Sequence, residues 1–310
     1  METISLGKTD VRITPLGMGA WQWGDKFMWG YGRGYTDSDL KTAFEETLKA
    51  GVNWVDTAEV YGMGTSEKLL GRFVSETNAK IVVATKCFPY PWRWSGRALL
   101  GALRASLKRL RLERVDLYQM HWPYPFVSIE SWMDAMAEAV KAGLTRAVGV
   151  SNYSAEQTHR ARERLAKHGI ALASNQIQYS LLHRTPERNG TIAACRELGV
   201  TVIAYSPIAK GVLSGKYTPD NIPPGVRGQM YNREYLTRVQ PLIGLMKEIG
   251  QAYGAKTPSQ VALNWLICKG AVPIPGAKNA RQAQDNAGGM GWRMSEAEVR
   301  ALDEASEKIV

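Results

Sequence analysis

A short apolar or β-branched run followed by an amphipathic helical stretch recurs about every 30 residues along the chain. Eight such runs centre near Gly17, Trp54, Val83, Leu117, Val148, Ser174, Ile203 and Val272. Strands that alternate with helices at this spacing pair in parallel, because each helix carries the chain back across the sheet. The repeat therefore predicts an α/β protein built on a parallel sheet.

Eight strand–helix units are the number that closes a (β/α)8 barrel, the TIM-barrel fold. The alternative, an open doubly wound sheet, would use about five or six strands. We therefore expect a barrel, with residues 1–310 as one domain, because no linker or shift in composition divides the chain. Dividing the length by about 150 would suggest two domains, but barrels often reach about 250 residues or more as one.

The expected helices are the amphipathic stretches 38–50, 66–74, 95–109, 129–142, 155–167, 191–198, 239–253, 258–269 and 280–287. A long loop, 206–237, is expected before the last two helices that precede the final strand. Two additions to the barrel are predicted: an N-terminal β-hairpin of 3–6 with 11–14, and a C-terminal helix over 295–308. The C-terminal helix opens with a capping-box pattern.

Several classes of protein are disfavoured by what the sequence lacks. The N-terminus is polar, so it resembles neither a secretory signal nor a transit peptide, and no apolar run approaches the roughly 20 residues of a spanning helix. Three widely spaced cysteines without a CxxC pair indicate reduced thiols, and so a cytoplasmic protein. The four histidines form no HExxH pattern, so we expect no metal site.

The formal net charge of +10 permits nucleic acid, an acidic membrane or an anionic cofactor as partner. Basic residues between Arg97 and Arg114 could suggest nucleic-acid binding. They alternate with Leu and Ala at helical spacing, however, and no nucleic-acid motif accompanies them, which favours a solvated helix face. We therefore expect neither nucleic acid nor membrane as a partner.

Polar residues follow the predicted strands in turn, where barrel enzymes place their chemistry. They are Asp56, Lys86, His121, Ser151 with Asn152, Gln176, Tyr205 with Ser206, and Gly276 with Lys278. Each one alone has a structural explanation: it could form an ion pair, or it could be a hydrogen-bonded polar residue at the rim of the barrel. Together they provide an acid, a base, an imidazole and amides at one rim.

The stretch DTAEVYGMGTSEKLLG at 56–71 resembles the signature of the aldo-keto reductase family. The resemblance continues in the family's order through VVATK, YQMHWP, GVSNYS, NQIQYS, AYSPIAKGVLSGKY and PIPGAKNARQAQDN, and covers nearly the whole chain. The last two segments are similar to the branch that contains bacterial and plant NADPH-dependent reductases and the potassium-channel β subunits. The family reduces aldehyde and ketone carbonyls to alcohols by hydride transfer.

The resemblance implies a catalytic tetrad of Asp56, Tyr61, Lys86 and His121. A free tyrosine, with a pKa near 10, is a poor proton donor. We expect the Lys86 ammonium to lower the pKa of Tyr61 towards working pH, and Asp56 to hold that ammonium in place. His121 would donate to the substrate oxygen and orient the carbonyl.

The dinucleotide fingerprint GxGxxG is absent, and 211–216 falls one residue short of a phosphate-binding P-loop. The resemblance instead implies NADPH bound in the barrel mode, on Gly19, Ala20, Trp21, Asp56, Ser151, Asn152, Gln176, Tyr205, Ser206, Pro207, Ile208, Lys210, Gly211, Leu213, Lys216, Arg227, Gly276, Lys278, Gln282 and Asn286. Lys278 before a helix N-terminus forms an anion site. The adenosine 2′-phosphate is its expected ligand, with Arg227 as a second contact, which favours NADPH over NADH.

Six of the ten tryptophans fall in loops at the rim that carries the tetrad. The predicted substrate pocket comprises Trp21, Trp23, Trp29, Tyr31, Phe88, Trp92 and Trp122. Loop packing explains some of these residues, but an aromatic pocket favours an apolar or aromatic carbonyl substrate.

Two functions remain open on this sequence: an NADPH-dependent reductase, and an NADPH-binding regulatory subunit of the same fold with little turnover. The intact tetrad favours the enzyme. Most of the family are monomers and the channel subunits are tetramers, so we expect a monomer, with an oligomer as the alternative.

Overall fold

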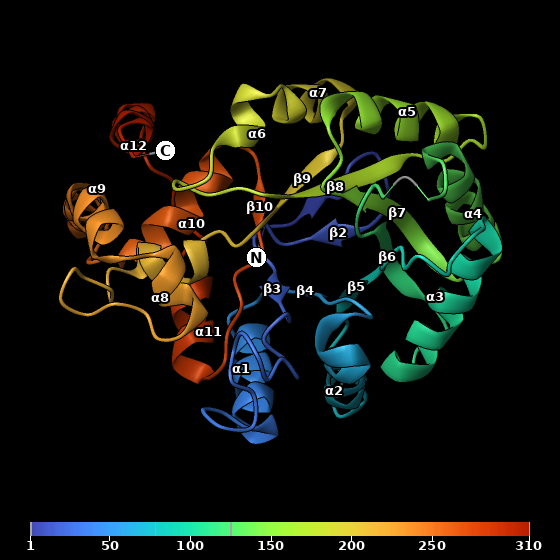
Figure 1. The fold of residues 1–310 in the computed structure, drawn as a ribbon, viewed down its shortest axis with the longest axis horizontal. Helices are drawn as coiled ribbons and strands as arrows, with labels where there is room; N and C mark the ends of the chain where they lie inside the picture. Colours follow the sequence, from blue (N-terminus) through green and yellow to red (C-terminus); the bar gives the residue numbers. More distant parts are fainter. Residues whose placement is uncertain (1, 78, 125, 310) are drawn as a thin grey trace.

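A computed structural model describes residues 2–77, 79–124 and 126–309. Eight parallel strands form one sheet in the order β10-β9-β8-β7-β6-β5-β4-β3, with helices outside it (Figure 1). The strands are β3 (Met18–Gly19), β4 (Trp54–Asp56), β5 (Val82–Cys87), β6 (Val115–Met120), β7 (Thr145–Ser151), β8 (Leu172–Gln178), β9 (Thr201–Tyr205) and β10 (Val272–Pro273). This architecture confirms the predicted (β/α)8 barrel.

The sheet closes between its first and last strands. Gly19 forms a parallel bridge with Gly276, and its backbone N–H donates to the Pro275 oxygen at 3.0 Å. A Cβ at Gly19 would lie 2.7 Å from the Ile274 oxygen, so only glycine permits this approach.

The helices that alternate with the strands are α1 (Asp37–Lys49), α2 (Thr65–Ser75), α3 (Gly96–Leu110), α4 (Ile129–Lys141), α5 (Ala155–Ala166), α6 (Thr185–Arg188), α7 (Thr191–Leu198), α10 (Pro258–Cys268) and α11 (Ala280–Ala287). Their starts follow from capping chemistry. Ser154 accepts a hydrogen bond from the Gln157 N–H at 3.2 Å, and Thr257 accepts one from the Gln260 N–H at the same distance. Ser95 takes the N-cap position of α3 without a side-chain cap hydrogen bond, so this helix begins at Gly96, one residue later than predicted.

The range 206–237, predicted as a loop, contains the 3-10 helix η2 (Ala209–Ser214), the short helix α8 (Val226–Met230) and the first residues of α9 (Arg233–Ala252). Helix α9 begins six residues before the predicted position 239. Asn232 explains the early start, because its side chain accepts a hydrogen bond from the Tyr235 N–H at 2.9 Å. The C-terminal helix α12 (Glu296–Glu307) and a 3-10 turn η1 (Tyr61–Gly64) complete the helical elements described.

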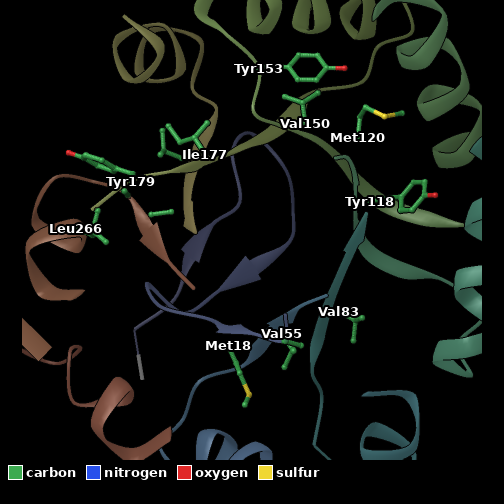
Figure 2. Close-up of a cluster of buried hydrophobic side chains, with 14 of the residues drawn as sticks. Met18, Val55, Val83, Tyr118, Met120, Val150, Tyr153, Ile177, Tyr179 and Leu266 are labelled. Atoms are coloured by element: carbon green, nitrogen blue, oxygen red, sulfur yellow. The ribbon is translucent and has the colours of Figure 1, made fainter. Parts of the chain in front are cut away.

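The main core lies between the strands and the surrounding helices. Figure 2 shows side chains of this layer on successive strands, among them Val55, Val83, Val150 and Ile177, together with Leu266 from α10. Neighbouring residues point to the opposite face, so the barrel interior receives every second side chain. Among the side chains that point into the barrel, those at the carboxyl ends of the strands are therefore Asp56, Lys86 and other polar residues.

An antiparallel hairpin of β1 (Ile4–Ser5) and β2 (Arg12–Ile13) closes the other end of the barrel (Figure 1). Its side chains Leu6, Val11 and Ile13 are fully buried against residues of the strands, including Trp54 and Leu117. The Trp54 indole N–H donates to the Thr14 oxygen at 3.1 Å. The predicted N-terminal hairpin is thus confirmed, and it leaves the carboxyl ends of the strands as the open mouth of the barrel.

No helix within the described ranges is long and apolar enough to span a membrane.

Candidate active site

The Lys86 ammonium lies at the centre of a buried polar cluster at the mouth of the barrel. It donates hydrogen bonds to an Asp56 carboxylate oxygen, to the Thr57 backbone oxygen at 2.8 Å, and to the Tyr61 hydroxyl at 3.1 Å. Strands β4 and β5 are neighbours, which places Asp56 beside Lys86, and the turn η1 after β4 brings Tyr61 above both. Three of the four predicted catalytic residues are therefore in direct contact.

The second Asp56 oxygen accepts hydrogen bonds from two side-chain amides, Gln119 and Gln176, each at 2.9 Å. The carboxylate is thus held by a cation on one oxygen and by amides on the other. Gln119 was not predicted as a site residue. The sequence does contain a signal for Gln119. It stands two residues before His121, and residues two apart along a strand point to the same face.

The pKa of Tyr61 is raised above its usual value of about 10 because the phenol is removed from bulk water. The charge on Lys86 acts in the opposite direction and the Asp56 carboxylate adds to the rise. Lys86 therefore acts on the pKa of Tyr61 in the expected direction, but burial outweighs its charge and the net shift is upward, away from neutral pH. Burial also acts to lower the pKa of Lys86, but the interactions with Asp56 and Tyr61 outweigh burial. The pKa of Lys86 therefore rises, and the ammonium stays charged.

His121 follows β6 and its ring meets the Tyr61 ring edge-on, with centroids 5.8 Å apart. Burial, reinforced by the charge on Lys86, lowers the pKa of His121 well below its usual value. The imidazole is therefore neutral at pH 7 and carries one N–H donor. Its backbone oxygen is held by the Asn152 amide at 3.1 Å.

The cluster opens into a cavity of about 1400 Å³. Its lining includes every predicted cofactor residue except Leu213, together with Tyr61 and His121 of the tetrad. Residues of the lining that were not predicted include Gln22, Asp25, Gln178, Tyr217, Thr257, Ser259 and Arg281. Leu213 is fully buried in the core instead, because the 3-10 turn η2 points it inward.

At the base of the cavity, the predicted polar residues bind one another. The Ser151 hydroxyl donates to the Gln176 backbone oxygen at 2.8 Å. The Tyr205 hydroxyl donates to the Asn152 side-chain oxygen at 3.0 Å, and Asn152 adopts a left-handed conformation with φ of 62°. These contacts fix the Asn152 amide beside the Tyr205 ring, next to the cluster of Lys86, Asp56 and Tyr61.

The far end of the cavity carries cations that converge on Trp29. The Lys278 ammonium donates to the Trp29 oxygen at 2.8 Å and lies 5.0 Å from the indole centroid. The Arg227 guanidinium lies 5.4 Å from the same ring. Burial, reinforced by the positive charges of Arg227 and Lys216, lowers the pKa of Lys278 to about 8. This end of the cavity is therefore suited to an anion.

These features fit a dinucleotide. The Gln22 side-chain oxygen is a buried acceptor with no hydrogen-bond partner among the described residues. The Gln22 side chain also packs directly against Gly276: a Cβ added at Gly276 would lie 2.0 Å from the side-chain nitrogen of Gln22. Ser206, Ala209 and Lys210 all take positive φ angles, which turns the backbone tightly along the cavity wall. No group of three or more His, Cys, Asp or Glu side chains in the described ranges could hold a metal ion.

The predicted substrate pocket is only partly assembled at the cavity. Trp21, Trp29 and Trp122 line it. Trp23 does not: its ring is fully buried and packs edge-on against Phe44 and Phe73. The structure therefore corrects this prediction, since Trp23 belongs to the core between α1 and α2.

Three further predicted pocket residues stand outside the cavity lining. The Tyr31 hydroxyl bonds to Asp37 and its ring packs on Tyr35. Phe88 meets the His121 ring edge-on, at 5.7 Å between centroids, and Trp92 is exposed further along the same loop.

The family model for the "Aldo/keto reductase family" matches residues 15–307. The chain belongs to the aldo/keto reductase family. Aldo-keto reductases are oxidoreductases that act on carbonyl compounds and use nicotinamide cofactors.

The chain is similar to proteins with several different activities. It is 39% identical to pyridoxal reductase, chloroplastic, of Arabidopsis thaliana, over 96% of this chain and 84% of the relative. It is 27% identical to the NADH-specific methylglyoxal reductase of Escherichia coli, over 100% and 99% of the two chains. The solved structure of a glycerol dehydrogenase from Gluconobacter oxydans is 27% identical, with a TM-score of 0.87 over 99% of this chain and 96% of that one.

Proposed function

We propose that this protein is an NADPH-dependent reductase of aldehydes and ketones with Tyr61 as the proton donor. The observation that carries the proposal is the contact of the Tyr61 hydroxyl with the buried Lys86–Asp56 pair, at the wall of a cavity large enough for a dinucleotide. A bound reduced nicotinamide supplies the hydride to the carbonyl carbon.

The residues of the chain handle the proton and the charge on the oxygen. As the carbonyl oxygen becomes an alkoxide, the Tyr61 hydroxyl transfers its proton to it, and the resulting phenolate is stabilised by the Lys86 ammonium. Asp56 keeps that ammonium charged and fixed. The neutral His121 donates its N–H to the same oxygen, and its low pKa keeps it from competing with Tyr61 as the acid.

Purified protein tests the proposal directly. We expect loss of NADPH absorbance at about 340 nm with a panel of aldehydes and ketones that includes benzaldehyde, propanal and pyridoxal. Pyridoxal is included because a relative at 39% identity is a pyridoxal reductase. NADPH binding without turnover on any carbonyl would contradict the proposal and favour the regulatory NADPH-binding subunit.

The preference for NADPH is expected to depend on Lys278. Lys278→Ala should raise the Kd of NADPH about 10- to 100-fold, the value of one charge-assisted hydrogen bond, and change the Kd of NADH little. Because the pKa of Lys278 is about 8 before the cofactor binds, NADPH affinity should weaken above that pH in the parent and not in the variant. Fluorescence titration with both cofactors measures these constants.

Lys26→Ala is the matched control, because Lys26 is an exposed lysine of the β3–α1 loop, whose Trp29 contacts Lys278, and it lies outside the cavity lining. An unchanged ratio of the two affinities in Lys278→Ala would contradict the assignment of the 2′-phosphate site.

We further propose that this chain folds as a single domain and that it works in a reducing compartment such as the cytosol. The three cysteines, Cys87, Cys195 and Cys268, are all free, and the first two are buried. Their separation along the chain and their burial support thiols that stay reduced.

A further inference from the structure

Arg109, in the last turn of helix α3, differs from the other basic residues of its segment. The other lysines and arginines between Arg97 and Arg114 are exposed. The Arg109 side chain is only 23% exposed, because it reaches towards helix α2, the neighbour of α3 around the barrel (Figure 1). A guanidinium that leaves solvent needs partners within the protein, and these partners indicate what the residue does.

The first partner of Arg109 is the fully buried carboxylate of Glu67 on α2. The Arg109 Nε–H donates to one Glu67 oxygen at 2.5 Å, and the Thr85 hydroxyl donates to the other at 2.6 Å. Thr85 is the residue before Lys86 on β5, so the two side chains point to opposite faces of the strand. Glu67 therefore joins Arg109 to the strand that carries Lys86.

Arg109 also packs against the turn η1, which carries Tyr61. Residues 62–64 in this turn all take left-handed backbone conformations, with φ of 54°, 53° and 85°. The middle one is Met63, a residue that keeps such a conformation only where the surrounding structure holds it. A Cβ at Gly64 would lie 2.7 Å from the Arg109 Cδ, so the methylene stem of Arg109 directly supports the turn.

The same side chain approaches the turn from the other side of Tyr61 as well. Arg109 Nη2 lies 4.0 Å from Oε2 of Glu59, which stands two residues before Tyr61. Neither Arg109 nor Glu67 belongs to the cavity lining. Any effect of these two residues on the reaction must therefore pass through the groups that they hold in place.

We propose that Arg109 and Glu67 are positioning residues for proton transfer by Tyr61. They fix the turn η1 relative to strand β5, and so keep the Tyr61 hydroxyl 3.1 Å from the Lys86 ammonium. Stabilisation of the phenolate depends on this distance, because the attraction between two charges weakens as they separate. The proposal rests on the proposed reductase function, and it adds the residues that position its proton donor.

The test removes the Arg109 stem and the buried charge together. Arg109→Ala alone would leave the Glu67 carboxylate buried without its cation, which is strongly destabilising. Adding Glu67→Gln avoids this, because the amide oxygen that it introduces can still accept from Thr85. In this double variant kcat for benzaldehyde should fall about 10- to 100-fold, the effect of misplacing a reacting group by about 1 Å. KM and the Kd of NADPH should change less than about 3-fold.

A second background shows whether the effect passes through Tyr61. In Tyr61→Phe the hydroxyl that the turn positions is absent, so Arg109→Ala with Glu67→Gln should lower the residual kcat no further. Single-turnover oxidation of NADPH measures these slow rates. General damage to the fold would lower kcat by the same factor in both backgrounds, and that result would overturn the proposal.

The matched control removes a comparable ion pair away from the site. Arg164 on α5 donates to both oxygens of Asp134 on α4, at 2.6 and 2.5 Å, and neither residue belongs to the cavity lining. Arg164→Ala with Asp134→Asn should leave kcat unchanged. Urea unfolding of the two double variants separates a loss of stability from a loss of rate.

If Arg109→Ala with Glu67→Gln does not fold, Glu67→Gln alone decides the question. It releases Arg109 and keeps an acceptor for Thr85, so kcat should fall in the parent and not in Tyr61→Phe. An unchanged kcat in the folded variant would overturn the positioning role alone. Failure of the parent protein to reduce any aldehyde or ketone would overturn the reductase function, and the positioning role with it.

Discussion

Replacing Tyr61 by Phe is expected to lower kcat for carbonyl reduction about 10²- to 10⁴-fold, the usual contribution of a positioned general acid. The variant removes only the hydroxyl. The ring keeps its contacts with Lys86, whose ammonium lies 4.8 Å from the ring centroid, and with His121. Cofactor affinity should therefore change less than about 3-fold, since no phenolic contact to the dinucleotide is required. Stopped-flow or steady-state NADPH oxidation measures the rate, and fluorescence titration measures the binding.

Tyr253→Phe is the control for loss of a phenolic oxygen. Its hydroxyl bonds to Glu298 at 2.7 Å at the surface, away from the cavity, so catalysis should be unchanged. If Tyr61→Phe kept more than about a tenth of the parent rate, Tyr61 could not be the proton donor.

The elevated pKa of Tyr61 changes how its role depends on pH. A phenol whose pKa lies above the usual value is protonated throughout the neutral range, so the acid is available without any adjustment of pH. In the proposed mechanism, Lys86 acts later, by stabilising the phenolate that would form when the proton leaves Tyr61. We therefore expect reduction to slow only at alkaline pH, where Tyr61 itself ionises.

The regular parts of the fold could be predicted because their signals are local. Helix α7 has the predicted range 191–198, bounded by Gly190 and Gly199, which both take positive φ angles. The start of α11 follows from Asn279, which caps it in the structure. The short helix α8 was missed because it has no side-chain cap of its own and is held by contacts such as the Arg227 bond to the Tyr217 hydroxyl at 3.1 Å, whereas the start of α9 does have a local signal in Asn232.

The candidate site was predictable where the strands end, since the alternation of side chains fixes which residues face the barrel interior. The loops were less predictable. Trp23 and Trp21 are two residues apart in the same loop, yet one is in the core and the other lines the cavity. Composition cannot separate them, because the local turn decides which ring meets Phe44 and Phe73 and which meets Tyr61.

Removing the charge at the centre of the cluster is expected to destabilise the fold as well as stop catalysis. Lys86→Met leaves the buried Asp56 carboxylate with amide donors only, and breaking a buried ion pair on one side costs about 3–5 kcal/mol. Because the pKa of Lys86 is raised, the contribution of Lys86 to the free energy of unfolding is complete below the usual lysine pKa of about 10.5. That contribution is lost only above this pH. The loss of stability in urea unfolding should therefore be the same between about pH 6 and pH 9.

The double variant Lys86→Met with Asp56→Asn separates charge from packing. With both charges gone, the amide oxygen introduced by Asp56→Asn can still accept from Gln119 and Gln176, which donate to the parent carboxylate at 2.9 Å. We expect the double variant to unfold at a higher urea concentration than Lys86→Met alone, and to remain catalytically inactive. A double variant less stable than the single one would show that Lys86 supports the fold by packing, and that its charge matters only to Tyr61.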